Sequence, residues 1–145
     1  MEAKIIPAAL TRPLRHRVLW QHIEHEEDCV IDIDEREDAV HLGVFDGAEL
    51  VSIGSLFRMH SDKIAHAKQY RLRAMATDPK LRKAGAGRLL IEKACEECKA
   101  RGAEVLWCDA REVALGFYAK LGFEMIDELY EVRNIGPHKF MYRDL

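Results

Sequence analysis

The first half of the chain consists of short apolar or alternating runs separated by turn signals, which predicts a series of β-strands. Lys4 to Ile6 is a candidate first strand. Two β-rich runs, Val40 to Phe45 and Glu49 to Phe57, flank Asp46-Gly47, a dipeptide typical of the turn of an antiparallel hairpin. Gln69 to Thr77 alternates two sets of side chains, one of which contains two arginines, so this strand has two dissimilar faces.

The second half adds helical spacing to this pattern. From Gly87 to Arg101 apolar residues recur mostly at four-residue steps, and Gly102 ends the pattern as a glycine after a helix does. A second helix is predicted over Glu112 to Leu121, and an N-terminal one opens at Thr11-Arg-Pro. Further strands are predicted at Ala103 to Cys108, Phe123 to Val132 and Lys139 to Tyr142. This order of elements indicates an α/β fold with a sheet of mixed direction.

The length and charge of the chain narrow the class of protein. Its 145 residues are 48% hydrophobic and 32% charged, a balance that predicts a single packed domain over residues 1–145. The formal net charge of −3 gives no general attraction to a nucleic-acid backbone or an anionic membrane. We find no long apolar run and no signal-peptide pattern, so we expect a cytoplasmic protein whose four cysteines are free thiols.

One stretch, Glu24 to Asp38, is strongly acidic: it holds nine carboxylates and one arginine. We call it the acidic segment. Its composition predicts a mobile, solvated loop that is too polar for the core.

The join between a strand and the long helix, Thr77 to Leu90, is the best candidate for a ligand site. Gly85 and Gly87 let the backbone approach a ligand closely, and the start of the helix offers unpaired N–H groups to an anion. Seven basic residues and one acidic residue lie between Lys68 and Arg88. This pattern favours phosphate binding, although an ordinary glycine-bearing loop with solvated lysines also fits it.

Two known phosphate motifs do not match this join. A P-loop requires Gly-Lys-Ser/Thr where this chain has Gly87-Arg88-Leu89, and a dinucleotide fingerprint requires glycine where it has Leu90. A nucleoside triphosphatase and a nicotinamide dehydrogenase are therefore disfavoured.

Two motifs resemble those of the GCN5-related N-acetyltransferase (GNAT) superfamily. One is Arg82-x-x-Gly85-x-Gly87, which follows a strand ending in Met-Ala-Thr-Asp-Pro, and the other is Phe117-Tyr-Ala-Lys-Leu-Gly-Phe123. The order of elements also matches, so the resemblance covers nearly the whole chain. It implies a mixed, mostly antiparallel central sheet flanked by helices, with a splayed strand pair for acetyl-CoA. Three further segments resemble an uncharacterised bacterial-type subgroup: Leu14 to Leu19, Tyr70 to Ala76 and Ile135 to Met141.

The resemblance assigns a co-substrate site. Backbone groups of one strand end would pair with the pantetheine arm of acetyl-CoA, and main-chain N–H groups of the following loop would hold its pyrophosphate. Lys83 stands where many members have glycine, which adds a cation near the phosphates. The implied binding residues are Met75, Ala76, Thr77, Arg82, Lys83, Ala84, Gly85, Ala86, Gly87 and Arg88.

The resemblance also suggests catalytic groups. Tyr118 corresponds to a tyrosine near the CoA sulfur and is the candidate acid that protonates the departing thiolate; a plain core tyrosine is the alternative. Asp109 is the candidate base, or else an N-cap of the following helix. Arg71 and Arg73 share a strand face and are candidates to bind a substrate carboxylate, or else they pair with the acidic segment. Arg111 replaces an asparagine that contacts the cofactor in many relatives.

The position of the acidic segment also bears on the acceptor, because relatives contact their acceptor substrate there. A solvated loop and a surface that favours a cationic amine both remain open. Four kinds of acceptor stay open: a lysine side chain, a polyamine, an aminoglycoside and a small aryl amine.

A metal site is the opposing hypothesis. Cys95 and Cys98 lie three residues apart in a predicted helix, and no second pair completes a zinc ligand set, so no metal is expected.

The predicted function is transfer of an acetyl group from acetyl-CoA to the primary amine of a small molecule or peptide, by direct attack in a ternary complex. A non-catalytic acyl-CoA sensor on the same fold is the alternative. An exposed final hairpin leaves a homodimer open.

Overall fold

The computed structural model describes residues 1–82 and 84–145, which form one seven-stranded sheet in the order β1-β2-β3-β4-β5-β7-β6. Neighbouring strands are antiparallel except for the parallel pair β4 and β5. The strands are β1 (Glu2–Ile6), β2 (Val40–Asp46), β3 (Glu49–Arg58), β4 (Gln69–Thr77), β5 (Val105–Arg111), β6 (Glu124–Val132) and β7 (Gly136–Asp144). The predicted α/β class with a mixed, mostly antiparallel sheet is confirmed.

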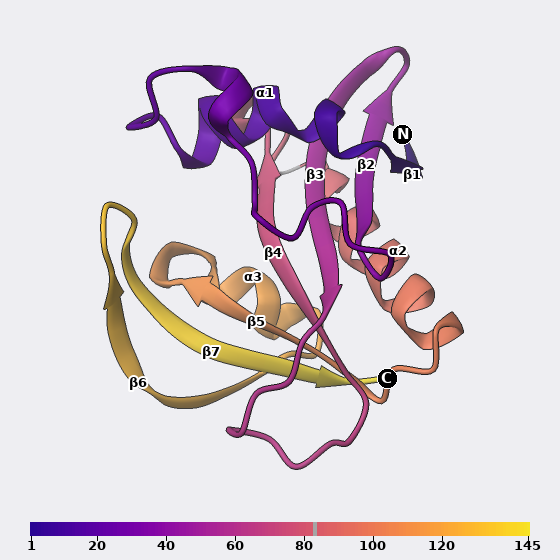
Figure 1. Ribbon diagram of the computed structural model, residues 1–145, viewed down its shortest axis with the longest axis vertical. Helices are drawn as coiled ribbons and strands as arrows, with labels where there is room; N and C mark the ends of the chain where they lie inside the picture. Colours follow the sequence, from indigo (N-terminus) through magenta and orange to yellow (C-terminus); the bar gives the residue numbers. More distant parts are fainter. Residues whose placement is uncertain (83) are drawn as a thin grey trace.

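Two helices cover one face of this sheet. The long helix α2 (Ala86–Ala100) buries Leu90, Ile91 and Ala94 in a cluster with residues of β2, β3 and β4, as the four-residue spacing predicts. The second predicted helix is a 3-10 turn, Glu112–Ala114, followed by the short helix α3 (Leu115–Lys120). Figure 1 shows α2 running behind β2 and β3, while β6 and β7 form a curved ribbon on the other side of the molecule.

The N-terminal helical segment packs against the opposite face. It consists of a 3-10 turn (Ala8–Thr11), one turn labelled α1 (Arg12–Leu14) and a π-helical turn (Arg15–Leu19). Leu14 is buried against Ile6, Ile53 and Ala76. The predicted helix is therefore present, but it is irregular, because it changes from 3-10 to α- to π-helical turns. No described helix is both long and apolar enough to cross a membrane.

The acidic segment differs from its prediction. It contains a 3-10 turn, Glu26–Asp28, but Cys29, Ile31 and Asp34 are buried, so the expectation that it is too polar for the core is wrong at these positions. The reason is a partner 19 residues earlier: the fully buried Arg15 donates from its two terminal nitrogens to the Asp34 carboxylate, at 2.7 and 2.9 Å.

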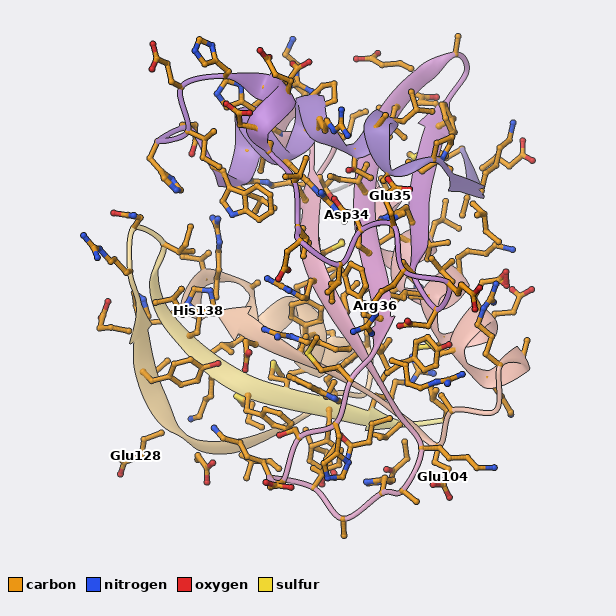
Figure 2. The ribbon with its side chains drawn as sticks, in the orientation of Figure 1. Asp34, Glu35, Arg36, Glu104, Glu128 and His138 are labelled. Atoms are coloured by element: carbon orange, nitrogen blue, oxygen red, sulfur yellow. The ribbon has the colours of Figure 1, made fainter. Side chains whose placement is uncertain are left out.

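This ion pair belongs to a buried polar network. Arg15 also donates to the Ser55 hydroxyl at 2.9 Å, and the His41 Nδ1 lies 2.7 Å from the same oxygen. The His41 Nε2–H donates to the Asp34 carbonyl at 2.8 Å. The network ties the N-terminal helical segment and the acidic segment to β2 and β3. Figure 2 shows Asp34 below that helical segment, in front of the sheet.

Candidate functional site

The parallel strands β4 and β5 separate soon after they start to pair. Their register covers only Gln69 to Arg71 against Val105 to Trp107, after which the strands diverge. A β-bulge in β4 contributes to this divergence: Ala74 has a φ of 51°, and the register with β3 shifts opposite Gly54. Figure 1 shows the resulting gap between the carboxyl ends of β4 and β5.

A cleft of about 650 Å³ occupies this region. One wall of the cleft is the end of β4, with Met75, Ala76 and Thr77. The pairing of β4 with β5 stops at Arg71, so the backbone of these three residues is not hydrogen-bonded to β5. The splayed strand pair that the family resemblance implied is thus present. An extended ligand arm can add to the exposed edge of β4 in the manner of another strand.

The start of α2 lies at one end of the cleft. Gly85 precedes the helix with a φ of 92°, a conformation that favours glycine, and the first helical bond runs from the Leu89 N–H to the Gly85 carbonyl at 3.0 Å. The N–H groups of Ala86, Gly87 and Arg88 come before that bond, so they have no partner within the helix. These groups suit a phosphate.

Gly87 also permits close packing at this point. A Cβ there would lie 3.1 Å from the Phe117 ring and 3.3 Å from the Met75 Cε, closer than ordinary contact. Gly87 and Arg82 line the cleft. The Arg88 side chain instead pairs with Glu92 at 2.9 Å on the exposed side of the helix. Lys83, predicted to lie near the phosphates, is outside the described residues.

Tyr118 of α3 lines the same cleft and is 5% exposed. Its ring packs edge-on against Phe117 and Phe123, with centroid distances of 5.1 and 5.3 Å. Burial raises the pKa of Tyr118 well above its ordinary value, and the neighbouring Cys108 adds to this while Arg111 opposes it. The phenol is therefore protonated at neutral pH, the form in which its O–H can donate a hydrogen bond.

Asp109 lies within β5, opposite Phe140 of β7, and not at the start of a helix. The residue that precedes the 3-10 turn is Arg111, so the N-cap alternative for Asp109 is wrong. The Asp109 carboxylate accepts a hydrogen bond from the Arg71 guanidinium at 2.8 Å. Arg71 also lies over the Trp107 ring, 4.8 Å from its centroid. The proposed pairing of Arg71 with the acidic segment is wrong, because its partner is Asp109.

Arg73 lines the cleft two residues further along β4 and is half-buried. Among the residues that the structure describes, no carboxylate forms an ion pair with it. Burial lowers the pKa of Arg73, and the neighbouring Arg71 lowers it further. Arg73 therefore differs from Arg71 in having its charge free for a ligand.

Several cleft residues were missed by sequence reasoning. Trp20, at the end of the N-terminal helical segment, and Ile135, between β6 and β7, both line the cleft. The two residues come from segments far apart in the chain, so their spacing carries no signal.

Arg111, which stands where many relatives have asparagine, also lines the cleft. It donates to the Leu19 carbonyl at 3.2 Å, and burial and the nearby Arg82 lower its pKa.

His138 was missed as well. It lies on β7 (Figure 2), opposite Arg111 of β5 in the strand register. Its side chain is buried and lines the cleft. Its Nδ1 lies 2.8 Å from the Gly136 carbonyl, so this nitrogen carries the hydrogen. The signal for it was its position inside Ile135 to Met141, one of the segments that resemble the bacterial subgroup.

Among the described residues, no three side chains of metal-ligating type gather in one place. Cys98 and Cys108 are buried, and burial raises the pKa of both thiols.

Comparison with known proteins agrees with this geometry. Residues 8–123 match the model of the acetyltransferase (GNAT) family. The uncharacterised N-acetyltransferase YitI of Bacillus subtilis (strain 168) is 37% identical over 145 residues, which are 100% of this chain and 97% of that protein.

Solved structures share the fold at lower identity. Escherichia coli ElaA superposes with a TM-score of 0.75 at 22% identity, covering 98% of each chain. An aminoglycoside 6'-N-acetyltransferase complexed with coenzyme A gives 0.76 at 16% identity, covering 99% of this chain and 97% of that one. With the family model and the relative at 37% identity, the chain belongs to the acetyltransferase (GNAT) family and is an acetyl-CoA-dependent acyltransferase.

Proposed function

We propose that this protein transfers an acetyl group from acetyl-CoA to the primary amine of a small molecule or peptide, by direct attack in a ternary complex. The observation that carries the proposal is the cleft between the diverging strands β4 and β5, which joins the glycine-bearing start of α2 to a protonated tyrosine and a carboxylate. Family membership favours this enzyme over a non-catalytic acyl-CoA sensor.

The co-substrate is held by backbone and by cations. Met75, Ala76 and Thr77 pair with the pantetheine arm, and the N–H groups at the start of α2 bind the pyrophosphate. Burial lowers the pKa of Arg111, and the nearby positive charge of Arg82 lowers it further. A polyanionic ligand relieves that repulsion, which supports its binding at this end of the cleft.

The chemical step needs a neutral amine. Asp109 takes a proton from the incoming ammonium group, and the amine nitrogen then attacks the thioester carbonyl. A C–N bond forms as the C–S bond breaks. Tyr118 donates a proton to the departing thiolate, and the second amine proton leaves to solvent. The proton held by Asp109 then returns to the tyrosinate through solvent, so acetyl-CoA and an ammonium give an amide, CoA and one proton. No cysteine acts as a nucleophile.

Arg71 is a positioning residue in this scheme. Its hydrogen bond at 2.8 Å fixes the Asp109 carboxylate at the point where the two strands begin to separate. Stacking on Trp107 holds the guanidinium itself in place.

The test is amine-dependent release of CoA thiol from acetyl-CoA, with the acetylated amine identified by mass spectrometry. The panel comprises amino acids, polyamines, aryl amines, an aminoglycoside and lysine-containing peptides. We expect release that depends on at least one amine and yields its acetamide. Release with no acetylated product, or no release with any amine, contradicts the proposal.

A further inference from the structure

The two faces of β4 give the cleft two sides. Arg73 lies opposite Ser55 of β3, and directly opposed side chains share a face. Ser55 contacts Arg15 and His41, so this face is the one beneath the N-terminal helical segment. Leu72 points the other way, into the cluster that α2 covers. Arg71 and Arg73 therefore lie on the side of the sheet away from α2, where an acceptor can approach the thioester.

On this side of the sheet, some charged side chains have an ion-pair partner and Arg73, within the described part of the chain, does not. Arg71 is neutralised by Asp109 at 2.8 Å, and Asp34 is neutralised by both terminal nitrogens of Arg15. Arg73 has no such partner among the residues described; Asp32 and Asp34 act on it only at longer range. A half-buried guanidinium without a partner is costly, because burial removes hydration that no ion pair replaces. An anionic ligand group supplies the missing partner.

Apolar side chains line the cleft together with Arg73. Trp20 comes from the end of the N-terminal helical segment, while Val132 and Ile135 come from the end of β6 and the turn after it; the buried His138 is a polar member of the same lining. Such a lining does not suit a polyamine, whose several charges would each lose hydration. It suits an apolar group on a ligand that also carries one anion.

We propose that the acceptor is an amino acid with an apolar or aromatic side chain, whose carboxylate is bound by Arg73 while its amine lies beside Asp109. The inference rests on the proposed acetyl transfer and names its substrate class. Arg73 and Arg71 are about 7 Å apart along the strand, from its rise per residue. Arg73 and the Arg71-held Asp109 line the same cleft, so a carboxylate bound by Arg73 and an amine beside Asp109 fall in one part of it. The planar guanidinium fits a carboxylate with two parallel hydrogen bonds.

The experiment compares matched acceptors. Leucine, phenylalanine and methionine are each assayed beside the corresponding amide and the decarboxylated amine, which keep the side chain and the amine but lose the carboxylate charge. We expect kcat/KM for an amino acid to exceed that for its amide and its amine by about 10- to 100-fold, the range of a charge-assisted hydrogen bond.

Variants connect this preference to Arg73. In Arg73→Gln the preference for the carboxylate should disappear through a raised KM for the amino acid, with the amide and the amine little affected. Arg73→Lys keeps the positive charge but cannot donate two parallel hydrogen bonds to a carboxylate, so it should restore part of the preference. Arg58→Gln is the control, because Arg58 is an exposed arginine of β3 that does not line this cleft. Unchanged acetyl-CoA affinity shows that each variant is folded.

The outcomes separate the two proposals. If amides or amines are acetylated as well as the amino acids, or if Arg73→Gln keeps the preference, the substrate class is wrong and acetyl transfer stands. If only other amines, such as polyamines, are acetylated, the substrate class is also wrong. If no amine is acetylated, the proposed function itself fails.

Discussion

Tyr118 is the residue whose role is easiest to isolate. Removing its hydroxyl in Tyr118→Phe leaves the packing against Phe117 and Phe123 intact. We expect kcat to fall by about 10²- to 10⁴-fold, the usual contribution of a general acid, with nearly unchanged acetyl-CoA affinity. Steady-state kinetics and titration calorimetry measure the two quantities. An unchanged kcat removes Tyr118 from the mechanism and leaves it a core tyrosine.

The Asp109 carboxylate gives a second test, in which pH is the variable. Asp109→Asn keeps the shape of the side chain and removes its capacity to accept a proton. We expect kcat/KM for the acceptor to fall by about 10²-fold or more at pH 7. The defect should shrink as pH rises, because a larger share of the amine is then neutral in solution. A loss of the same size at every pH assigns Asp109 a positioning role only.

The four cysteines behave alike at the residue scale. Burial raises the pKa of the Cys29, Cys95, Cys98 and Cys108 thiols, so little thiolate is present near pH 8. We expect the native protein to react slowly with a disulfide-exchange reagent and the urea-unfolded protein to react at once with four equivalents. Rapid labelling of the native protein contradicts this burial. The result also sets the background of the thiol-release assay.

At the scale of elements, the buried pair of Arg15 and Asp34 joins the N-terminal helical segment to the acidic segment. Asp34→Ala leaves Arg15 buried without its carboxylate, which we expect to cost about 3–5 kcal/mol of unfolding free energy. The double variant Arg15→Met with Asp34→Leu should lose less unfolding free energy than the sum of the losses in the single variants Arg15→Met and Asp34→Leu. Urea unfolding measures each value. Additive losses contradict a direct coupling between the two residues.

The same pair predicts a dependence on acid. Burial acts to raise the pKa of Asp34, but the hydrogen bonds from Arg15 and the Ile31 N–H outweigh it and hold the pKa below its ordinary value. A pKa lower in the folded state gives stability that is complete above the unfolded value near 4 and is lost as pH falls below it. Asp34→Asn should therefore lose less stability than the wild type between pH 6 and pH 3. Equal losses contradict the role of Asp34.

Some of these elements could be predicted from the sequence and others could not. The Asp46-Gly47 hairpin and helix α2 follow from local signals, because turn chemistry and apolar spacing act over a few residues. The burial of Asp34 does not, because a count of charges in the acidic segment cannot reveal a partner 19 residues away. The pairing of Arg71 with Asp109 likewise depends on the register of β4 against β5.

For the whole molecule, the two family motifs predicted that Gly87 and Tyr118 belong to one site, and both line the cleft. The rest of the cleft was predicted less completely. Its lining includes Trp20, Ile135 and His138, which meet only once the sheet is assembled and the two strands diverge. The homodimer stays a prediction; β6 forms an edge of the sheet and exposes Met125 and Leu129.

The central claim is that the cleft between β4 and β5 binds acetyl-CoA through the start of α2. Titration calorimetry with acetyl-CoA, with its dephospho form and with acetyl-pantetheine, which lacks the phosphates, tests it most directly. Arg82→Gln is compared with Lys80→Gln, since Lys80 is exposed and outside the cleft. We predict binding of acetyl-CoA that weakens by about tenfold or more without the pyrophosphate, and weakens in Arg82→Gln but not in Lys80→Gln. No binding of acetyl-CoA, or equal binding of acetyl-pantetheine, contradicts the account.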